Sequence, residues 1–324
     1  MKLLEEKINT DVSLKNILFA TDFSAASEAA LPYVAAMSLR YGGTVHVAHV
    51  LPEINLVRAS AVDPVTLGSI YEDAHSRAQE KIQEVATRLA GYPHRTHVRH
   101  GKVSEVLSEI IHADEIDLLV TGTHGRTGLG KLFLGSVAEE ILRTATCPVL
   151  TVGPKAPKPH GVPKHRDNGD IPPISVEVGH ILYATDFGLH SLIAAPYAFS
   201  LAREFRARLV LLHVIEEYGE HLHNHPGPIA AALRKLEQLQ PEDAVLRHSP
   251  EPVVQFGSPA DHILQTATER ETDLIVCAGC AATKRQGCHT SALDYGTQSH
   301  YQCALPSTNG ALIAPKLCES TGLA

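Results

Sequence analysis

A glycine-rich loop carries the strongest chemical signal in this chain. It begins at Gly122, directly after an apolar run, and ends at Gly135 and Ser136, where an amphipathic pattern starts. Glycines let bare backbone N–H groups approach a ligand, and a helix N-terminus carries about half a positive charge. Arg126 and Lys131 lie in the same loop and add cations. The loop therefore predicts a site for a phosphate chain.

Two other interpretations of this loop stay open. Ser136 and Glu139 have the spacing of a capping box, which stabilises a helix start without any ligand. Gly125 to Lys131 has the skeleton of a P-loop, G-x-x-x-x-G-K. The next residue is Leu132, however, where a P-loop needs the Ser or Thr hydroxyl that binds Mg²⁺.

Alternating strands and helices must position this loop. Short apolar runs at 17–21, 44–50 and 117–122 are typical of strands that are buried on both faces. A helical pattern follows each run, so we expect a parallel sheet with helices on both faces and ligands at the carboxyl ends of its strands. The helical stripes are Ala30, Val34, Met37 and Tyr41, then Ile70, Ala74, Ala78, Ile82, Val85 and Leu89.

The chain is an internal duplication. NILFATDFS, which starts at Asn16, recurs as HILYATDFG from His180. VHVAHVLPE from Val45 recurs as LVLLHVIEE from Leu209, at the same offset. Self-similarity at a fixed offset indicates two copies of one unit.

This duplication divides the chain into four parts. Residues 1–153 form the first copy, and residues 154–178 form a linker that is rich in Pro, Lys and Gly. Residues 179–276 form a second, degenerate copy. Residues 277–324 form a tail without helical or strand periodicity, which we expect to be poorly ordered.

The glycine pattern resembles the signature of the universal stress protein family, G-x-x-G, nine residues, then G-[ST]. Here it reads Gly122-Thr123-His124-Gly125, nine residues, then Gly135-Ser136. The resemblance covers both copies and implies a Rossmann-like, open, parallel five-stranded α/β sheet, duplicated in tandem with the second copy incomplete.

The resemblance also implies a ligand, ATP, with or without Mg²⁺. Asp22 would contact the ribose or adenine side, and Ala20 and Val50 would line the adenine pocket. The phosphates would lie along the glycine loop. A carboxylate suits ribose hydroxyls or an exocyclic amine and would repel phosphate, which agrees with this division; alternatively, Asp22 only precedes a helix cap at Ser24. The complete predicted site is Ala20, Thr21, Asp22, Val50, Gly122, Thr123, His124, Gly125, Arg126, Gly135, Ser136 and Val137.

The second copy keeps only half of this site. Asp186 and Val214 repeat Asp22 and Val50, but no glycine loop follows. Without its last helix and strand, this copy should leave an apolar sheet edge and weaken stability or change oligomerisation.

The tail itself carries the signature of a frameshift. Back-translation of residues 294–309, read one nucleotide later, permits a string that ends in CPVLT, as the first copy does at Cys147 to Thr151. We therefore hypothesise a frameshift between about Cys277 and Cys288, which the nucleotide sequence of the gene would test.

We expect no metal site. The frameshift hypothesis makes a zinc site at Cys277, Cys280 and Cys288 a coincidence of sequence, although C-x-x-C followed by C-H is typical of one. The histidine-rich segment HLHNH, at 221–225, is more typical of a polar surface loop.

Composition and charge limit the partners and the cell compartment that we expect. The net charge is −8, which argues against nucleic acid as a partner. No run approaches the roughly 18 apolar residues of a membrane span, and six cysteines make no disulfide framework, so we expect a cytoplasmic protein. The partners expected are an adenine nucleotide and either a second copy of the chain or the other domain.

The function predicted is an ATP-binding stress-response or regulatory module without catalytic residues. Two alternatives stay open: a slow Mg²⁺-dependent ATP hydrolase or phosphotransferase, and a nucleotide-free scaffold.

Overall fold

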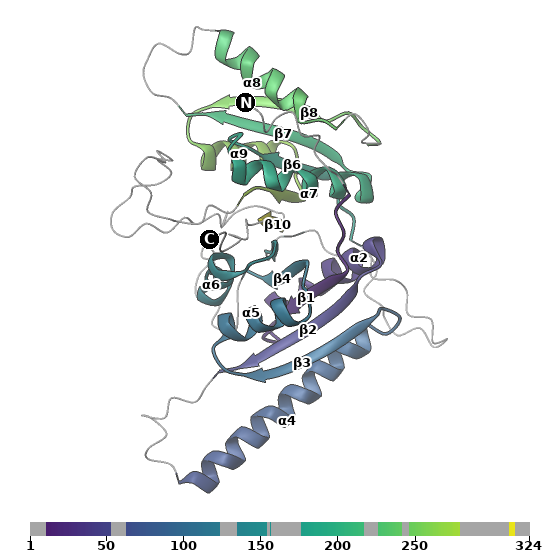
Figure 1. The fold of residues 1–324 in the computed structure, drawn as a ribbon, viewed down its shortest axis with the longest axis vertical. Coiled ribbons are helices and arrows are strands. Elements are labelled where there is room, and N and C mark those ends of the chain that lie inside the picture. Colours follow the sequence, from purple (N-terminus) through teal and green to yellow (C-terminus); the bar gives the residue numbers. More distant parts are fainter. Residues whose placement is uncertain are drawn as a thin grey trace, which may run out of the picture.

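A computed structural model shows two copies of one α/β unit stacked along the long axis of the molecule (Figure 1). The structure describes residues 11–52, 63–123, 135–153, 156, 176–216, 226–241, 246–278 and 311–314.

The first copy is a five-stranded parallel sheet with helices on both faces. Its strands lie in the order β3-β2-β1-β4-β5. They are β1 (Asn16–Ala20), β2 (Thr44–Leu51), β3 (His94–His100), β4 (Leu118–Gly122) and β5 (Val149–Val152). The helices are α1 (Ala25–Glu28), α2 (Leu31–Tyr41), α4 (Pro64–Arg88), α5 (Val103–Ala113) and α6 (Ser136–Thr144).

The second copy repeats this arrangement with four parallel strands. They are β6 (His180–Ala184), β7 (Arg208–Ile215), β8 (Glu251–Phe256) and β9 (Leu274–Val276). Its helices are α7 (Leu189–Phe205), α8 (Pro226–Gln238) and α9 (Pro259–Glu269). A counterpart of α6 would fall within residues 279–310, which lie outside the described part of the chain.

One strand from the tail closes the second sheet. β10 (Ala311–Ala314) pairs parallel with β9 and antiparallel with β5, so the two copies share one ten-stranded sheet. The prediction of an open apolar edge on the second copy is therefore wrong. A strand edge exposes unpaired N–H and C=O groups, and four residues of the tail supply the missing partners on both sides. The frameshift hypothesis concerns the same tail and stays a prediction.

The helices follow the apolar stripes of the sequence, except that Ile70, near the start of α4, is exposed. α2 buries Val34 and Met37, and the C-terminal half of α4 buries Ala78, Ile82 and Val85 against the sheet. The first turns of α4 extend beyond the strands (Figure 1). No helix within the described ranges combines the length and the apolar character that crossing a membrane requires.

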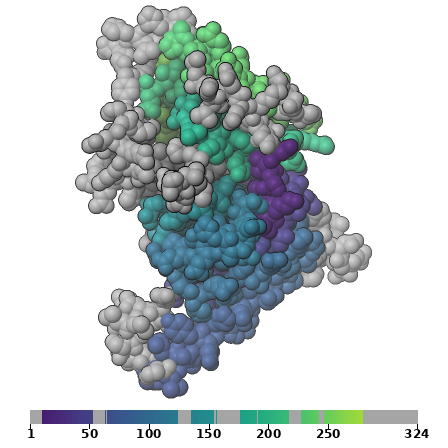
Figure 2. Space-filling view, viewed as in Figure 1, coloured from purple at the N-terminus to yellow at the C-terminus, as the bar shows by residue number. Residues whose placement is uncertain are grey.

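The two copies pack against each other through α2 and α7. One apolar core includes buried residues of both copies, such as Val34 and Phe199. At its margin the Tyr41 hydroxyl lies 3.0 Å from Ser200 Oγ, and the Arg40 guanidinium lies 4.2 Å from the Phe205 ring. Figure 2 shows the N-terminal residues, in purple, at the boundary between the copies. The tandem chain therefore forms an intramolecular domain pair.

The sheet order creates a switch point between β1 and β4. The chain leaves β1 for β2 on one side, whereas β4 lies on the other side, with Ala20 opposite Thr121. Crossovers that leave in opposite directions open a crevice at the carboxyl ends of such strands. The segments after β1 and β4 therefore meet at this point.

Candidate functional site

A cavity of about 750 Å³ lies over the carboxyl ends of β1, β2 and β4. This volume falls within the range of pockets for small molecules, roughly 300–1,000 Å³. Nine of the predicted site residues line it: Ala20, Thr21, Asp22, Val50, Gly122, Thr123, Gly135, Ser136 and Val137. His124, Gly125 and Arg126 lie outside the described residues, as do Lys131 and the rest of the P-loop-like segment.

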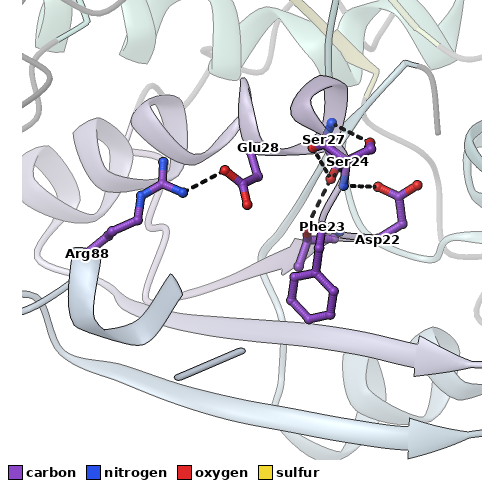
Figure 3. A network of polar contacts seen from close by, with 7 residues as sticks. Asp22, Phe23, Ser24, Ser27, Glu28 and Arg88 are labelled. Carbon is purple, nitrogen blue, oxygen red and sulfur yellow. Dashed lines mark hydrogen bonds and ion pairs between the residues drawn. The ribbon is translucent and has the colours of Figure 1, made fainter. Parts of the chain in front are cut away.

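A tight turn after β1 carries Asp22 into this cavity. Asp22 Oδ1 accepts a hydrogen bond from the Ser24 backbone N–H at 3.0 Å, and Ser24 caps α1 (Figure 3). Asp22 thus holds the turn before the cap, as one sequence interpretation proposed, and also lines the cavity. The next residue, Phe23, has a φ of 60°, a conformation that bulky residues rarely adopt. This backbone sends the two side chains in different directions (Figure 3).

His49 joins the same turn to β2 by a hydrogen bond, a role that was not predicted from the sequence. Its Nδ1–H donates to the Thr21 carbonyl oxygen at 2.8 Å, and the Thr21 N–H donates to the Ala48 carbonyl oxygen at 3.0 Å. The Phe23 ring lies 4.3 Å from the His49 ring. Because a carbonyl only accepts, the proton of His49 is fixed on Nδ1. The repeat contained the signal, since His213 occupies the same place in the second copy.

The N-terminus of α6 forms the opposite wall. Gly135 is the N-cap residue, with its N–H bonded to the Thr123 carbonyl oxygen at 2.8 Å, and no side chain caps the helix. Ser136 is therefore the first helical residue, and the capping box with Glu139 is wrong. Ser136 and Val137 line the cavity from this first turn. Backbone N–H groups of an uncapped helix start are suited to an anion.

Gly122 is a glycine for a packing reason. A Cβ at this position would lie 2.7 Å from the Ala26 carbonyl oxygen and 2.8 Å from the Ser27 Cα. β4 can therefore approach α1 only without a side chain here. This close approach brings Asp22 and Thr123 to the same cavity.

Two cations of α4 also line the cavity, and neither was predicted from the sequence. Arg77 and Lys81 lie one helical turn apart and share a face. Lys81 Nζ lies 5.8 Å from the centre of the Phe23 ring. The available signal was their spacing beside the apolar stripe of α4.

The second copy contains the same turn, held by the same histidine hydrogen bond. His213 Nδ1–H donates to the Thr185 carbonyl oxygen at 2.8 Å, and the ring of Phe187, which has a φ of 62°, lies 4.4 Å from the His213 ring at an angle of 39°. Asp186 Oδ1 accepts from the Gly188 N–H at 2.7 Å. This part of the site is thus an intrinsic feature of the repeated unit, whereas the segment that would correspond to the start of α6 lies outside the described residues of the second copy.

The cavity offers different chemistry at its two ends. Apolar side chains surround the end near β2, where Asp22 supplies a carboxylate that can accept hydrogen bonds. The start of α6 supplies backbone donors at the other end, and α4, which contacts β2 and β3, adds Arg77 and Lys81 to the lining. A ligand with a flat apolar part and an anionic part fits this distribution.

Comparisons with known proteins agree with the repeated architecture. The sequence model of the universal stress protein family matches residues 13–153 and 177–280, more than half of the chain. Universal stress protein A homolog 1 of Coxiella burnetii is 32% identical over 138 residues, covering 43% of this chain and 95% of that protein. A universal stress protein of Mycolicibacterium smegmatis is 25% identical over 208 residues, covering 63% of this chain and 65% of that protein.

A solved structure shows the same tandem fold. The crystal structure of a universal stress protein from Archaeoglobus fulgidus covers 94% of this chain and 99% of its own, with a TM-score of 0.64 and 20% identity. The two matched segments coincide with the two α/β units of the structure. The chain therefore belongs to the universal stress protein family.

Proposed function

We propose that the first copy binds ATP and that the protein acts as a nucleotide-binding module of the stress response. The observation that carries this proposal is the cavity at the β1/β4 switch point, which joins Asp22 to the uncapped start of α6. The adenine would lie against Ala20 and Val50, with the ribose near Asp22. The phosphates would lie at Gly135 and Ser136, together with His124, Gly125 and Arg126 of the loop. Mg²⁺, when present, would accompany the phosphates.

The electrostatics support this orientation. The helix start of α6 favours a phosphate, while Asp22 repels one and can accept hydrogen bonds from ribose hydroxyls. Arg77 and Lys81 line the same cavity and can neutralise a polyphosphate.

Direct nucleotide analysis tests the proposal. Freshly purified protein is denatured and any released nucleotide identified, and the stripped protein is titrated with ATP calorimetrically. We expect one ATP per chain. Release of ADP would favour slow hydrolysis, and the absence of any bound or rebound adenine nucleotide would favour a scaffold.

The duplication provides a matched control. Asp22→Ala and Asp186→Ala each remove a carboxylate that accepts a backbone N–H in the same turn. We expect Asp22→Ala to weaken ATP binding and Asp186→Ala to leave it unchanged. Equal effects of the two substitutions would contradict a site in the first copy.

A further inference from the structure

A cluster of three potential metal ligands, one buried and two half-buried, lies at the end of α5 remote from the cavity. His46 comes from β2, His97 from β3, and Asp114 is the C-cap of α5. The side chains are 2%, 13% and 20% exposed, respectively. None of these residues lines the nucleotide cavity.

The potential ligand atoms already lie at distances close to those of a coordinated ion. His46 Nδ1 and His97 Nε2 are 3.2 Å apart. The Asp114 carboxylate lies 3.7 Å from the former and 3.9 Å from the latter. Two imidazole nitrogens bound to one tetrahedral Zn²⁺ at about 2.05 Å would be about 3.3 Å apart.

The local charges also suit a cation. Burial lowers the pKa of both histidines, although Asp114 opposes this, which favours the neutral rings that a metal requires. Asp114 contributes a carboxylate at the C-terminus of α5, where the helix carries about half a negative charge.

The second copy shows that the fold does not require these two histidines. Its strands have the same register, with Val253 opposite Leu212 as His97 is opposite Ala48. Val253 and Val210 pack together in an apolar cluster at the places of His97 and His46. The sheet is thus stable with two valines here.

The ion pair beside the cluster explains Asp114 but not the histidines. Arg95 Nη1 lies 3.5 Å from Asp114 Oδ1. The second copy keeps this pair with its charges exchanged, since Arg270, the C-cap of α9, lies 2.6 Å from Glu251. A pair of opposite charges therefore belongs to the fold, whereas the two histidines are an addition of the first copy.

We propose that His46, His97 and Asp114 bind one divalent transition-metal ion of the Zn²⁺ class. Two imidazoles and one carboxylate suit Zn²⁺, Co²⁺ or Ni²⁺ and leave a coordination position for water. The ring planes are 12° apart, with the two nitrogens facing each other. The ion takes the place of the hydrogen-bonding proton between the two facing nitrogens. The ring that carried this proton binds it on its other nitrogen instead, and both rings tilt toward Asp114.

The test is a Co²⁺ titration of the full chain after treatment with a chelator. Visible absorption reports the coordination of Co²⁺, and sulfur ligands add a charge-transfer band in the near ultraviolet. We expect one equivalent of Co²⁺ with nitrogen and oxygen ligands and without that band. Zn²⁺ should displace it and raise the melting temperature.

Variants identify the ligands. His46→Val combined with His97→Val introduces the residues of the second copy and should remove this equivalent while circular dichroism stays unchanged. Asp114→Asn should weaken Co²⁺ binding at least tenfold. Arg95→Gln should strengthen it, because a cation beside the metal is removed. His221→Asn with His223→Asn controls for the histidine-rich segment and should bind Co²⁺ as the unmodified chain does.

Two results would overturn the proposal. One is an unmodified chain that shows no Co²⁺ spectrum; the cluster is then a hydrogen-bonded structural group. The other is a double valine variant that keeps the full stoichiometry and spectrum. Asp114→Asn, which retains both histidines, keeps the test decisive if the double variant does not fold.

Discussion

The imidazole of His49 donates a hydrogen bond from Nδ1 to the Thr21 carbonyl oxygen over 2.8 Å, joining the turn after β1 to the end of β2. The same bond, from His213 to Thr185, has the same length in the second copy. Both copies thus position an aspartate by the same hydrogen bond, and in the first copy the start of α6 lines the same cavity as that aspartate.

Replacing either histidine should destabilise the fold, but only one replacement should affect the ligand. His49→Ala and His213→Ala each leave a carbonyl oxygen without this donor, at a cost of about 1–3 kcal/mol in the free energy of unfolding. We expect His49→Ala alone to weaken ATP binding, because it releases the turn that carries Asp22. Chemical denaturation and calorimetry measure the two effects. Comparable loss of affinity in both variants would contradict a positioning role.

Gly135→Asp should separate phosphate binding from helix stability. Gly135 has a φ of −63° and is the N-cap of α6, so aspartate fits the backbone and is a favourable cap. Its carboxylate would occupy and repel the phosphate position. We expect the affinity for ATP to fall at least about tenfold, or about 1.4 kcal/mol, while the affinity for adenosine changes much less.

The control for this substitution is Gly135→Ala, which adds no charge. Similar losses for ATP and adenosine in the aspartate variant would place the phosphates elsewhere.

The cations of α4 should act on the phosphates. Lys81→Ala is expected to weaken ATP binding more than adenosine binding, and the difference should shrink at high salt. Lys235→Ala is the matched control, because Lys235 Nζ lies 5.1 Å from the centre of the Phe187 ring and Lys81 Nζ lies 5.8 Å from the centre of the Phe23 ring. An equal loss of adenosine affinity in Lys81→Ala would assign the lysine to packing instead.

The second copy should lose stability in mild acid through His213. Burial lowers the pKa of His213, although the Thr185 carbonyl and Asp186 oppose this and only Lys235 adds to it. Below about pH 6.5 the unfolded chain takes up a proton that the folded chain resists, so the free energy of unfolding falls as the pH falls.

Nuclear magnetic resonance of labelled histidine measures this titration, with His213→Gln as the assignment control. A midpoint below about 6.5 is expected. A midpoint at or above that value would show that Asp186 and the Thr185 carbonyl dominate.

β10 should couple the two copies. Leu312→Pro removes a backbone N–H from a strand that pairs on both sides, with β5 and with β9. We expect faster amide exchange in β5 and β9 and two separate unfolding transitions. Leu312→Val, which keeps the backbone donor, should exchange as the unmodified chain does. Unchanged protection in the proline variant would show that α2 and α7 suffice to join the copies.

Local sequence features were enough to predict the fold class, the tandem organisation and much of the candidate site. The alternation of apolar runs and helical stripes predicted a parallel α/β unit, because such strands are buried on both faces. The repeat from Asn16 and His180 predicted the tandem organisation. The glycine spacing predicted the family, and the resemblance to that family implied nine of the residues that line the cavity.

Only the tertiary structure decided what depends on contacts between distant segments. The hydrogen bond from His49 to Thr21, the approach of Lys81 to Phe23 and the cluster of His46, His97 and Asp114 join separate elements that no local spacing connects. The prediction of a capping box at Ser136 was wrong because the hydrogen bond from the Gly135 N–H to the Thr123 carbonyl oxygen fixes where α6 begins. The prediction of an open sheet edge was wrong because β10, which has no strand periodicity in the sequence, pairs with β5 and with β9. Hydrogen bonding between strands is set by what lies beside them, which a single sequence does not encode locally.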